Sequence, residues 1–150
     1  MFVEKKNVFE KKFYAKIEES GRVTAKKIPV LQDAKRTKDA VAKLEKDGFT
    51  LHTVVFRMLS WGEHCRIMRE CVRTDAETSM RFHDSYEIDT KKLVAVLHSW
   101  DFTRVNSSGE TVKTDPDEST VKMLYPPLAE FLLKLYDEEG ELSPDAEKNS

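Results

Sequence analysis

The sequence predicts an α+β fold: a single, mostly helical domain with an N-terminal β-hairpin. Three observations carry this prediction. The chain of 150 residues is long enough for one domain. An alternating pattern broken by turn residues spans about residues 12–30, and apolar residues recur at helical spacing over much of residues 37–136. The domain is therefore expected to cover residues 1–136, and the acidic segment 137–150 is expected to be a disordered tail.

The hairpin is predicted from two extended segments. Residues 13–18 alternate in polarity, Ser20-Gly21 supplies turn chemistry, and residues 23–30 resume the extended pattern. Pro29 has no N–H to donate to a strand ladder, so the second strand should lie at an edge or end just before it. A hairpin alone is marginally stable in water, so we expect it to pack on the helices or to pair with another chain.

A first helix is predicted from Thr37, because Val41 and Leu44 would share one face. Gly48 stands where a left-handed C-terminal cap is expected, which places the end of this helix just before it.

Residues 51–59 are ambiguous between helix and strand. Residues 53–56 have strand propensity, yet the apolar positions fit a single helical stripe, and this favours a helix. The stripe consists of Leu51, Val54, Val55, Met58 and Leu59.

Ser60 and Glu63 have the spacing of a capping box, in which each side chain satisfies an amide of the other residue. A helix is therefore expected to begin there and to run to about Arg73. Trp61 is expected to fill the corner where the chain turns.

The second half predicts a buried helix, a polar turn and a final amphipathic helix. Asp89 or Thr90 should cap a helix that ends at Trp100 and is apolar nearly all round. Residues 102–112 indicate a turn or short hairpin, and Pro126-Pro127 suits the first turn of the last helix. The apolar stripe of that helix consists of Leu128, Phe131, Leu132, Leu135 and Tyr136.

The formal net charge is −2, but the charges are unevenly distributed. Residues 1–50 hold 13 Lys and Arg against 8 Asp and Glu, whereas residues 101–150 hold 5 against 12. This polarity fits contact between the two ends of the fold, head-to-tail association of copies, or simply solvated surface at both ends. The overall charge is not that of a dedicated nucleic-acid binder, and no apolar run approaches the ~20 residues that span a bilayer, so no membrane partner is expected.

No pattern in the sequence indicates catalysis or a cofactor. The side chains that could bind a metal gather only at His64, Cys65, Cys71 and His83. Five residues separate the cysteines, which is not the spacing of structural zinc ligands, and His64 and Cys65 would point about 100° apart on a helix. We therefore expect no catalytic residues, no metal and no cofactor.

Three arginines raise the question of phosphate binding. Arg66, Arg69 and Arg73 would line one exposed helix face and could grip phosphates. Glu63 and Glu70 lie on the same helix, so local ion pairs explain the arginines equally well, and nucleic acid is not expected as a partner.

Residues 89–136 show a characteristic order of features. An apolar helix ends in Trp100, a polar turn contains Gly109, and Thr114-Asp115-Pro116 begins a short segment. Leu124-Tyr125-Pro126-Pro127 then leads into the amphipathic helix. This order resembles the tail assembly chaperones of long-tailed bacteriophages. Residues 51–73 are less like that family and resemble the small hub- or baseplate-assembly proteins of contractile-tailed phages equally well.

The resemblance implies a non-catalytic protein that binds the tape-measure protein during tail morphogenesis in the host cytoplasm. It also implies that the protein is absent from the finished virion, and in some relatives a frameshift adds a second domain. The alternative is a structural virion component, such as a baseplate, connector or other tail protein.

Binding of a helix in a groove uses apolar anchors at i, i+3, i+4 and i+7. The stripes within 51–58 and 128–135 fit this spacing, although most such stripes pack the chain's own core. Leu133, Met123 and Tyr125 fall off the main stripes and are candidates for exposed contact. Self-association could use the same surface. The expected partner-binding residues are Met123, Tyr125, Leu128, Phe131, Leu132, Leu133 and Leu135.

Overall fold

The structure, a computed structural model, describes residue 3 and residues 7–140. Five helices and eight strands are present in that part of the chain, which is 40% helical and 29% strand. The fold is α+β, and the prediction of a mostly helical domain is wrong. The difference arises because two segments predicted as helix, around residues 51–57 and 97–100, are strands.

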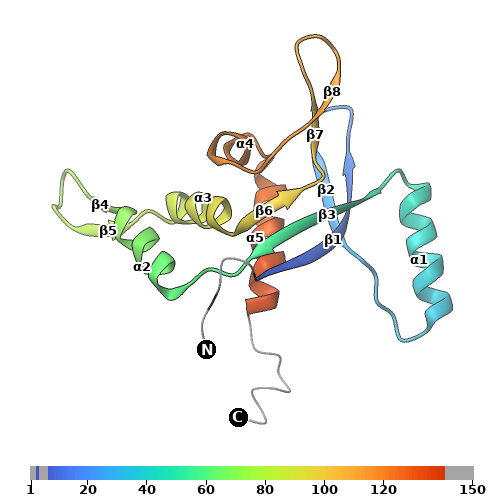
Figure 1. Ribbon diagram of the computed structural model, residues 1–150, viewed down its shortest axis with the longest axis horizontal. Helices are drawn as coiled ribbons and strands as arrows, with labels where there is room; N and C mark the ends of the chain where they lie inside the picture. The colour runs from blue at the N-terminus through green and yellow to red at the C-terminus, as the bar shows by residue number, and fades with distance from the viewer. Residues whose placement is uncertain (1–2, 4–6, 141–150) are drawn as a thin grey trace.

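The elements alternate along the chain (Figure 1). The strands are β1 (Val8–Ile17), β2 (Val23–Lys27), β3 (Thr50–Arg57), β4 (Val72–Thr74), β5 (Arg81–His83), β6 (Leu97–Trp100), β7 (Thr103–Val105) and β8 (Thr111–Lys113). The helices are α1 (Ala34–Lys46), α2 (Trp61–Glu70), α3 (Ser85–Val96), α4 (Glu118–Lys122) and α5 (Pro126–Gly140).

Four strands form an antiparallel sheet in the order β2-β1-β3-β6. The predicted hairpin is β1 and β2, with Ala15 opposite Ala25, and β2 ends at Lys27, just before Pro29. On its other side β1 pairs with β3, so the hairpin is stabilised by a strand of its own chain. The β4–β5 and β7–β8 pairs form two separate small ribbons.

Residues 51–57 form the central strand β3, not a helix. Val54 and Phe56 are completely buried on the inner face of the sheet, whereas Leu51 on the opposite face is half exposed. The stretch Thr53-Val54-Val55 is β-branched and fits a pleated surface between two neighbouring strands. The apolar residues of this segment fit a helical repeat, but residues 53–56 also have strand propensity. Pairing with β1 and β6 stabilises the strand, and the prediction of a helix here is wrong.

Helix α3 begins and ends earlier than predicted. Its N-cap is Asp84, whose carboxylate accepts the N–H groups of Tyr86 and Glu87 at 3.1 Å each, so neither Asp89 nor Thr90 caps it. Residues 97–100 leave the helix and pair with β3 as β6. Trp100 lies opposite Val54, and its indole Nε1–H donates to the carbonyl oxygen of Thr114 at 2.9 Å.

Ser60 caps α2 as predicted, since its Oγ accepts the Glu63 N–H at 3.2 Å. The helix ends at Glu70, three residues before the predicted end. Trp61 is 78% exposed and stacks on the His64 ring, so the expectation that it fills the corner is wrong. The predicted end of α1 is confirmed: Gly48 follows the helix in a left-handed conformation with φ of 93°.

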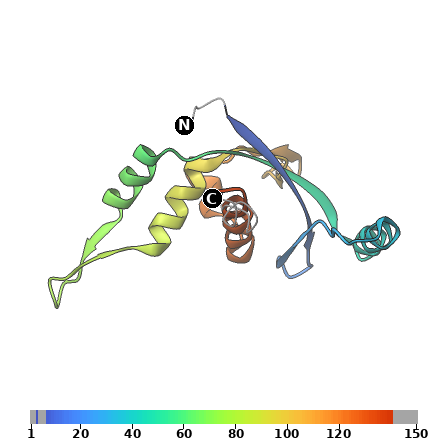
Figure 2. The ribbon, with the colours of Figure 1, turned by 90° about the horizontal axis from the view of Figure 1, so that it is seen from below.

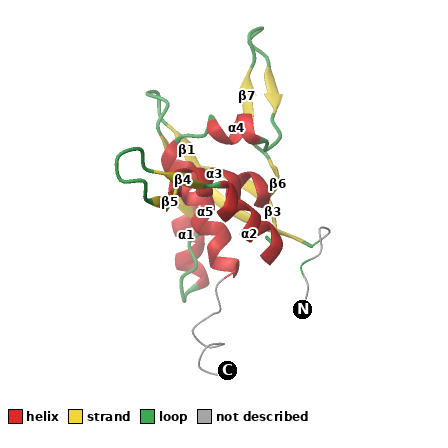
Figure 3. Cartoon of the chain, turned by 90° about the vertical axis from the view of Figure 1, so that its left-hand side faces the viewer, coloured by secondary structure: helices red, strands yellow, loops and turns green. Residues whose placement is uncertain are grey.

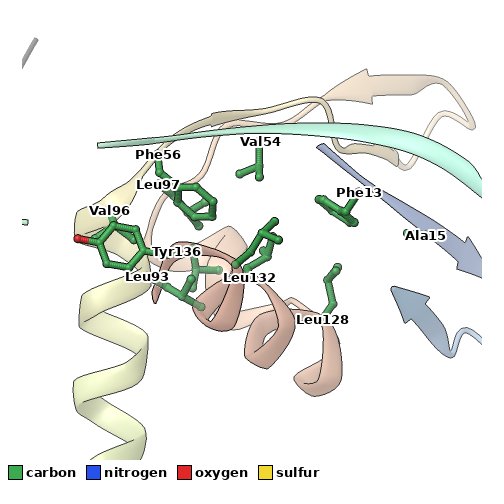
Figure 4. Close-up of a cluster of buried hydrophobic side chains, with 12 residues drawn as sticks. Phe13, Ala15, Val54, Phe56, Leu93, Val96, Leu97, Leu128, Leu132 and Tyr136 are labelled. Atoms are coloured by element: carbon green, nitrogen blue, oxygen red, sulfur yellow. The ribbon is translucent and has the colours of Figure 1, made fainter. Parts of the chain in front are cut away.

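Helix α5 crosses the inner face of the sheet and completes the core (Figures 2 and 4). Pro126-Pro127 opens it, as predicted, and it continues to Gly140. Residues 141–150 of the predicted tail lie outside the described residues. The buried core consists of Phe13, Ala15, Val54, Phe56, Leu93, Val96, Leu97, Val121, Leu128, Leu132, Leu135 and Tyr136.

Ion pairs join the basic N-terminal region to the acidic end of α5. Lys11 Nζ lies 2.8 Å from Glu139 Oε2, and Lys27 pairs with Glu138. Contact between the two ends of the fold, one explanation of the charge polarity, is therefore present. These pairs are solvent-exposed and contribute at most about 1 kcal/mol each.

Three parts of the chain project from the core: α1, the β4–β5 ribbon and the β7–β8 ribbon (Figures 1 and 2). No residue of α1 is buried.

Candidate protein-binding groove

An apolar surface groove of about 400 Å³ lies among α3, α4 and α5. Aliphatic side chains form most of its wall, and the ring of Tyr86, which is 85% exposed, stands beside them. The three helices contribute Leu93, Val121, Ala129 and Leu133 to the wall, and the loop between α4 and α5 contributes Leu124. A groove of this composition can hold apolar side chains of a partner helix.

The groove exists because α4 and α5 follow each other closely and both pack on α3. Asp117 and Thr120 form a reciprocal capping box that fixes the start of α4. Val121, in the middle of this short helix, is buried against the core. Pro126 then starts α5 immediately after the loop, which places the first turns of α5 alongside α3 (Figure 3).

The predicted partner-binding residues lie in different surroundings. Leu128, Leu132 and Leu135 are at most 8% exposed and belong to the chain's own core, so the regular stripe of α5 faces inward (Figure 4). Leu133 lines the groove. Met123 is 69% exposed on the loop after α4.

The two remaining residues of that set, Tyr125 and Phe131, are half-buried against the core. The Phe131 ring packs against Phe13 with centroids 5.3 Å apart. Of the predicted residues, Leu133 and Met123 are therefore the ones best placed to contact a partner without any change in the fold.

The rim of the groove carries a net negative charge. Asp89 and Glu130 line it, and neither forms an ion pair with another described residue. Lys122 also lines it, but its Nζ lies 2.9 Å from Glu118 Oε1. The hydrogen bond from Lys122 and its positive charge lower the pKa of Glu118, so the Glu118 carboxylate offsets the charge of Lys122 at the rim.

The candidate metal ligands do not form a site. His64 stacks on exposed Trp61, Cys71 is completely buried, and His83 is exposed on β5 opposite Val72. Among the described residues, no three His, Cys, Asp or Glu side chains are grouped as metal ligands. Both cysteines are free thiols, and burial raises the pKa of the Cys71 thiol.

The three arginines do not share one helix face. Arg66 and Arg69 lie on α2, whereas Arg73 lies on β4, where it pairs with Glu87 and donates to the backbone carbonyl of Glu70 at 3.1 Å. The interpretation of a single arginine row is wrong, because the helix ends before it reaches Arg73.

One group of hydrogen-bonded polar side chains was not predicted from the sequence. His52 Nδ1 lies 3.0 Å from Asp101 Oδ1, and His52 Nε2 lies 3.1 Å from Thr50 Oγ1. The other Asp101 oxygen accepts the Thr53 N–H at 3.0 Å, and the His52 ring packs between Phe13 and Phe102. This order of hydroxyl, imidazole and carboxylate is that of a nucleophilic triad, but here it ties the turn after β6 to β3.

No helix in the described part of the chain combines the length and the apolar character needed to cross a bilayer. No protein-family model, curated protein or solved structure matches the sequence or the fold. The groove and the exposed elements around it are therefore the basis for assigning a function.

Proposed function

We propose that the protein is a non-catalytic assembly chaperone of a long-tailed bacteriophage. It binds amphipathic helical segments of the tape-measure protein in the host cytoplasm before the tail tube forms. The observation that carries the proposal is the apolar groove among α3, α4 and α5, which Leu133 lines. The resemblance of residues 89–136 to tail assembly chaperones falls on α3, α4 and α5, the elements that form this groove.

A partner helix would place one apolar stripe in the groove. Leu93 and Val121 form part of the wall and are buried in the core, so the wall is rigid. Leu133 and Tyr86 offer apolar surface that is still accessible. A preformed wall lowers the entropic cost of binding, because few side chains must be ordered when the partner arrives.

Exposed apolar side chains outside the groove also support a role in protein binding. Val30 before α1, Trp61 at the start of α2 and Phe82 on β5 are each at least half exposed. Exposed aromatic residues of this kind are common anchors in protein interfaces. A chaperone for a long helical client needs such distributed contacts.

Co-expression with the tape-measure protein tests the proposal. If the genes flanking this one include a very long, coiled-coil-rich reading frame, its product is the client to use. We expect the wild-type chain to co-purify with it, and Leu133→Ser to reduce recovery about ten-fold or more. Leu51→Ser is the matched control, because Leu51 is half exposed on the opposite face of the sheet and should leave recovery unchanged. Equal recovery with a folded Leu133→Ser variant would remove the groove from the proposal.

Mass spectrometry of purified particles separates a chaperone from a structural virion component. A chaperone should be missing from mature particles but present in lysates during assembly. Detection of the chain in particles at the copy number of a tail protein would favour the structural alternative.

A further inference from the structure

We propose that α1 and the extended segment before it, residues 28–46, form an arm that docks in the α3–α4–α5 groove of a second copy of this chain. The inference goes beyond the proposed function, since it concerns the chain alone and requires no client. It rests on the exposure of the arm, on its charge and on the charge of the groove.

The arm has apolar surface that its own chain leaves uncovered. Val30 is 87% exposed and Leu31 is 48% exposed, immediately before a helix with no buried residue. Val41 and Leu44 lie one turn apart on one face of α1 and are half-buried. The segment is held in shape by a hydrogen bond from the Leu31 N–H to Thr37 Oγ1 at 3.0 Å, so the arm is preformed.

The arm is also strongly basic. Helix α1 carries five cations against the two acids Asp39 and Glu45. None of these cations forms an ion pair with another residue in the described part of the chain. They are Lys35, Arg36, Lys38, Lys43 and Lys46.

The groove has the complementary character. Its wall is apolar, and its rim carries Asp89 and Glu130, which likewise have no ion-pair partner among the described residues. Helix α5, which forms one side, is acidic as a whole, with four acids and the single cation Lys134. A basic helix that carries a short apolar stripe therefore matches both the wall and the rim.

The arm cannot reach the groove of its own chain in this fold. Helix α1 lies beyond the start of β3, whereas α3 lies near the opposite end of that strand (Figures 1 and 2). Docking must therefore join two copies, either reciprocally in a closed dimer or head to tail in a longer assembly. The client helix of the proposed function would compete with the arm for the same groove.

Sedimentation velocity of the purified full chain, over a range of concentrations, tests this inference. The wild-type mass should rise above 17.4 kDa with concentration and fall again in about 1 M salt, where charge attraction is screened. Two double variants reverse one side each: Lys35→Glu/Lys38→Glu on the arm and Asp89→Lys/Glu130→Lys at the groove. For each variant alone, the dissociation constant of self-association should be about ten-fold or more higher than for the wild type, because like charges then face each other.

An equimolar mixture of the two variants is the decisive sample. The reversed arm of one variant matches the reversed groove of the other, so the mixture should regain the wild-type mass. Arg104→Glu/Lys113→Glu on the β7–β8 ribbon is the control of equal charge change and should behave as the wild type. Circular dichroism verifies that every variant is folded.

Three outcomes would overturn the inference: a wild-type chain that stays at 17.4 kDa, an association insensitive to both reversals, or a mixture that fails to recover. A nucleic acid is the other partner that a basic arm could bind. If the arm reversal abolishes binding of a single-stranded DNA oligonucleotide while leaving the mass unchanged, the arm serves that ligand and the inference is wrong. Because the tape-measure protein is absent from these samples, failure here leaves the proposed chaperone function standing.

Discussion

The backbone N–H of Leu59 donates a hydrogen bond to the hydroxyl of Tyr136 at 3.0 Å. The two residues are 77 positions apart, and Tyr136 is only 6% exposed. This hydrogen bond joins the chain just after β3 to the last turns of α5. The Tyr136 ring also packs against the Phe56 ring of β3. The hydrogen bond is one of the few specific polar contacts that hold α5 on the sheet, and so helps to position the groove.

Tyr136→Phe is expected to lower the free energy of unfolding by about 1–2 kcal/mol, because a partly buried N–H loses its acceptor while the ring is retained. Urea denaturation measures the change. Tyr125→Phe is the control, since the Tyr125 hydroxyl forms no hydrogen bond with a described residue, and it should shift stability by less than about 0.5 kcal/mol. Equal effects of the two substitutions would refute the structural role of the Leu59 contact.

Leu132→Ala should be among the most destabilising substitutions in α5. Leu132 is 0% exposed at the centre of the core, and its truncation leaves a cavity that costs about 2–5 kcal/mol. Leu133→Ala, one position along and lining the groove, should cost clearly less. Thermal and urea unfolding of the two variants compare them directly. If Leu133→Ala were the more damaging, the inward face of α5 would be misassigned.

The turn between β4 and β5 should respond to acid. Hydrogen bonds from the backbone N–H groups of Thr78 and Glu77 lower the pKa of Asp75 below its ordinary value. Because the pKa is lower in the folded state than in the unfolded state, this stabilisation is fully present above about pH 4. It is lost as the pH falls through the folded pKa.

An NMR titration of the carboxyl carbons measures the pKa of Asp75. Its midpoint should lie below the ordinary value, and the amide signals of Glu77 and Thr78 should shift with it. Asp75→Asn should remove that transition. A midpoint at or above the ordinary value would show that these hydrogen bonds do not form in solution.

The two thiols should differ in reactivity. Cys71 is completely buried and burial raises the pKa of its thiol, whereas Cys65 is half-buried on α2. Since the thiolate is the reactive form, modification with a disulfide reagent at pH 8 should show one fast thiol and one at least about ten-fold slower. Cys65→Ser should abolish the fast phase, and Cys71→Ser should preserve it. Two fast thiols in the wild-type chain would mean that the α2–β4 corner is open.

Much of the fold could be predicted from local chemistry. Turn residues placed the β1–β2 hairpin, the Ser60 hydroxyl placed the start of α2, and Pro126 placed the start of α5. Each of these features depends on a few neighbouring residues. The Asp84 cap of α3 also has a local signal in the sequence, since Glu87 follows it at capping-box spacing, and the prediction of Asp89 or Thr90 missed it.

The strands β3 and β6 could not be predicted in this way. Their positions depend on pairing with each other and with β1, which brings together segments about 40 residues apart. The contact between His52 and Asp101 is a consequence of that pairing. In the same way, the groove depends on how α3 meets α5, so its wall combines residues that share no sequence pattern, whereas the regular stripe of α5 faces the core.

Hydrogen–deuterium exchange of the chain, with and without a co-purified tape-measure fragment, tests the central claim most directly. The account predicts that the fragment slows exchange in residues 85–96 and 118–133, which form the groove, and leaves the β7–β8 ribbon at 103–113 unchanged. Protection confined to the ribbon or to the β4–β5 turn, with no change in α3 or α5, would contradict it.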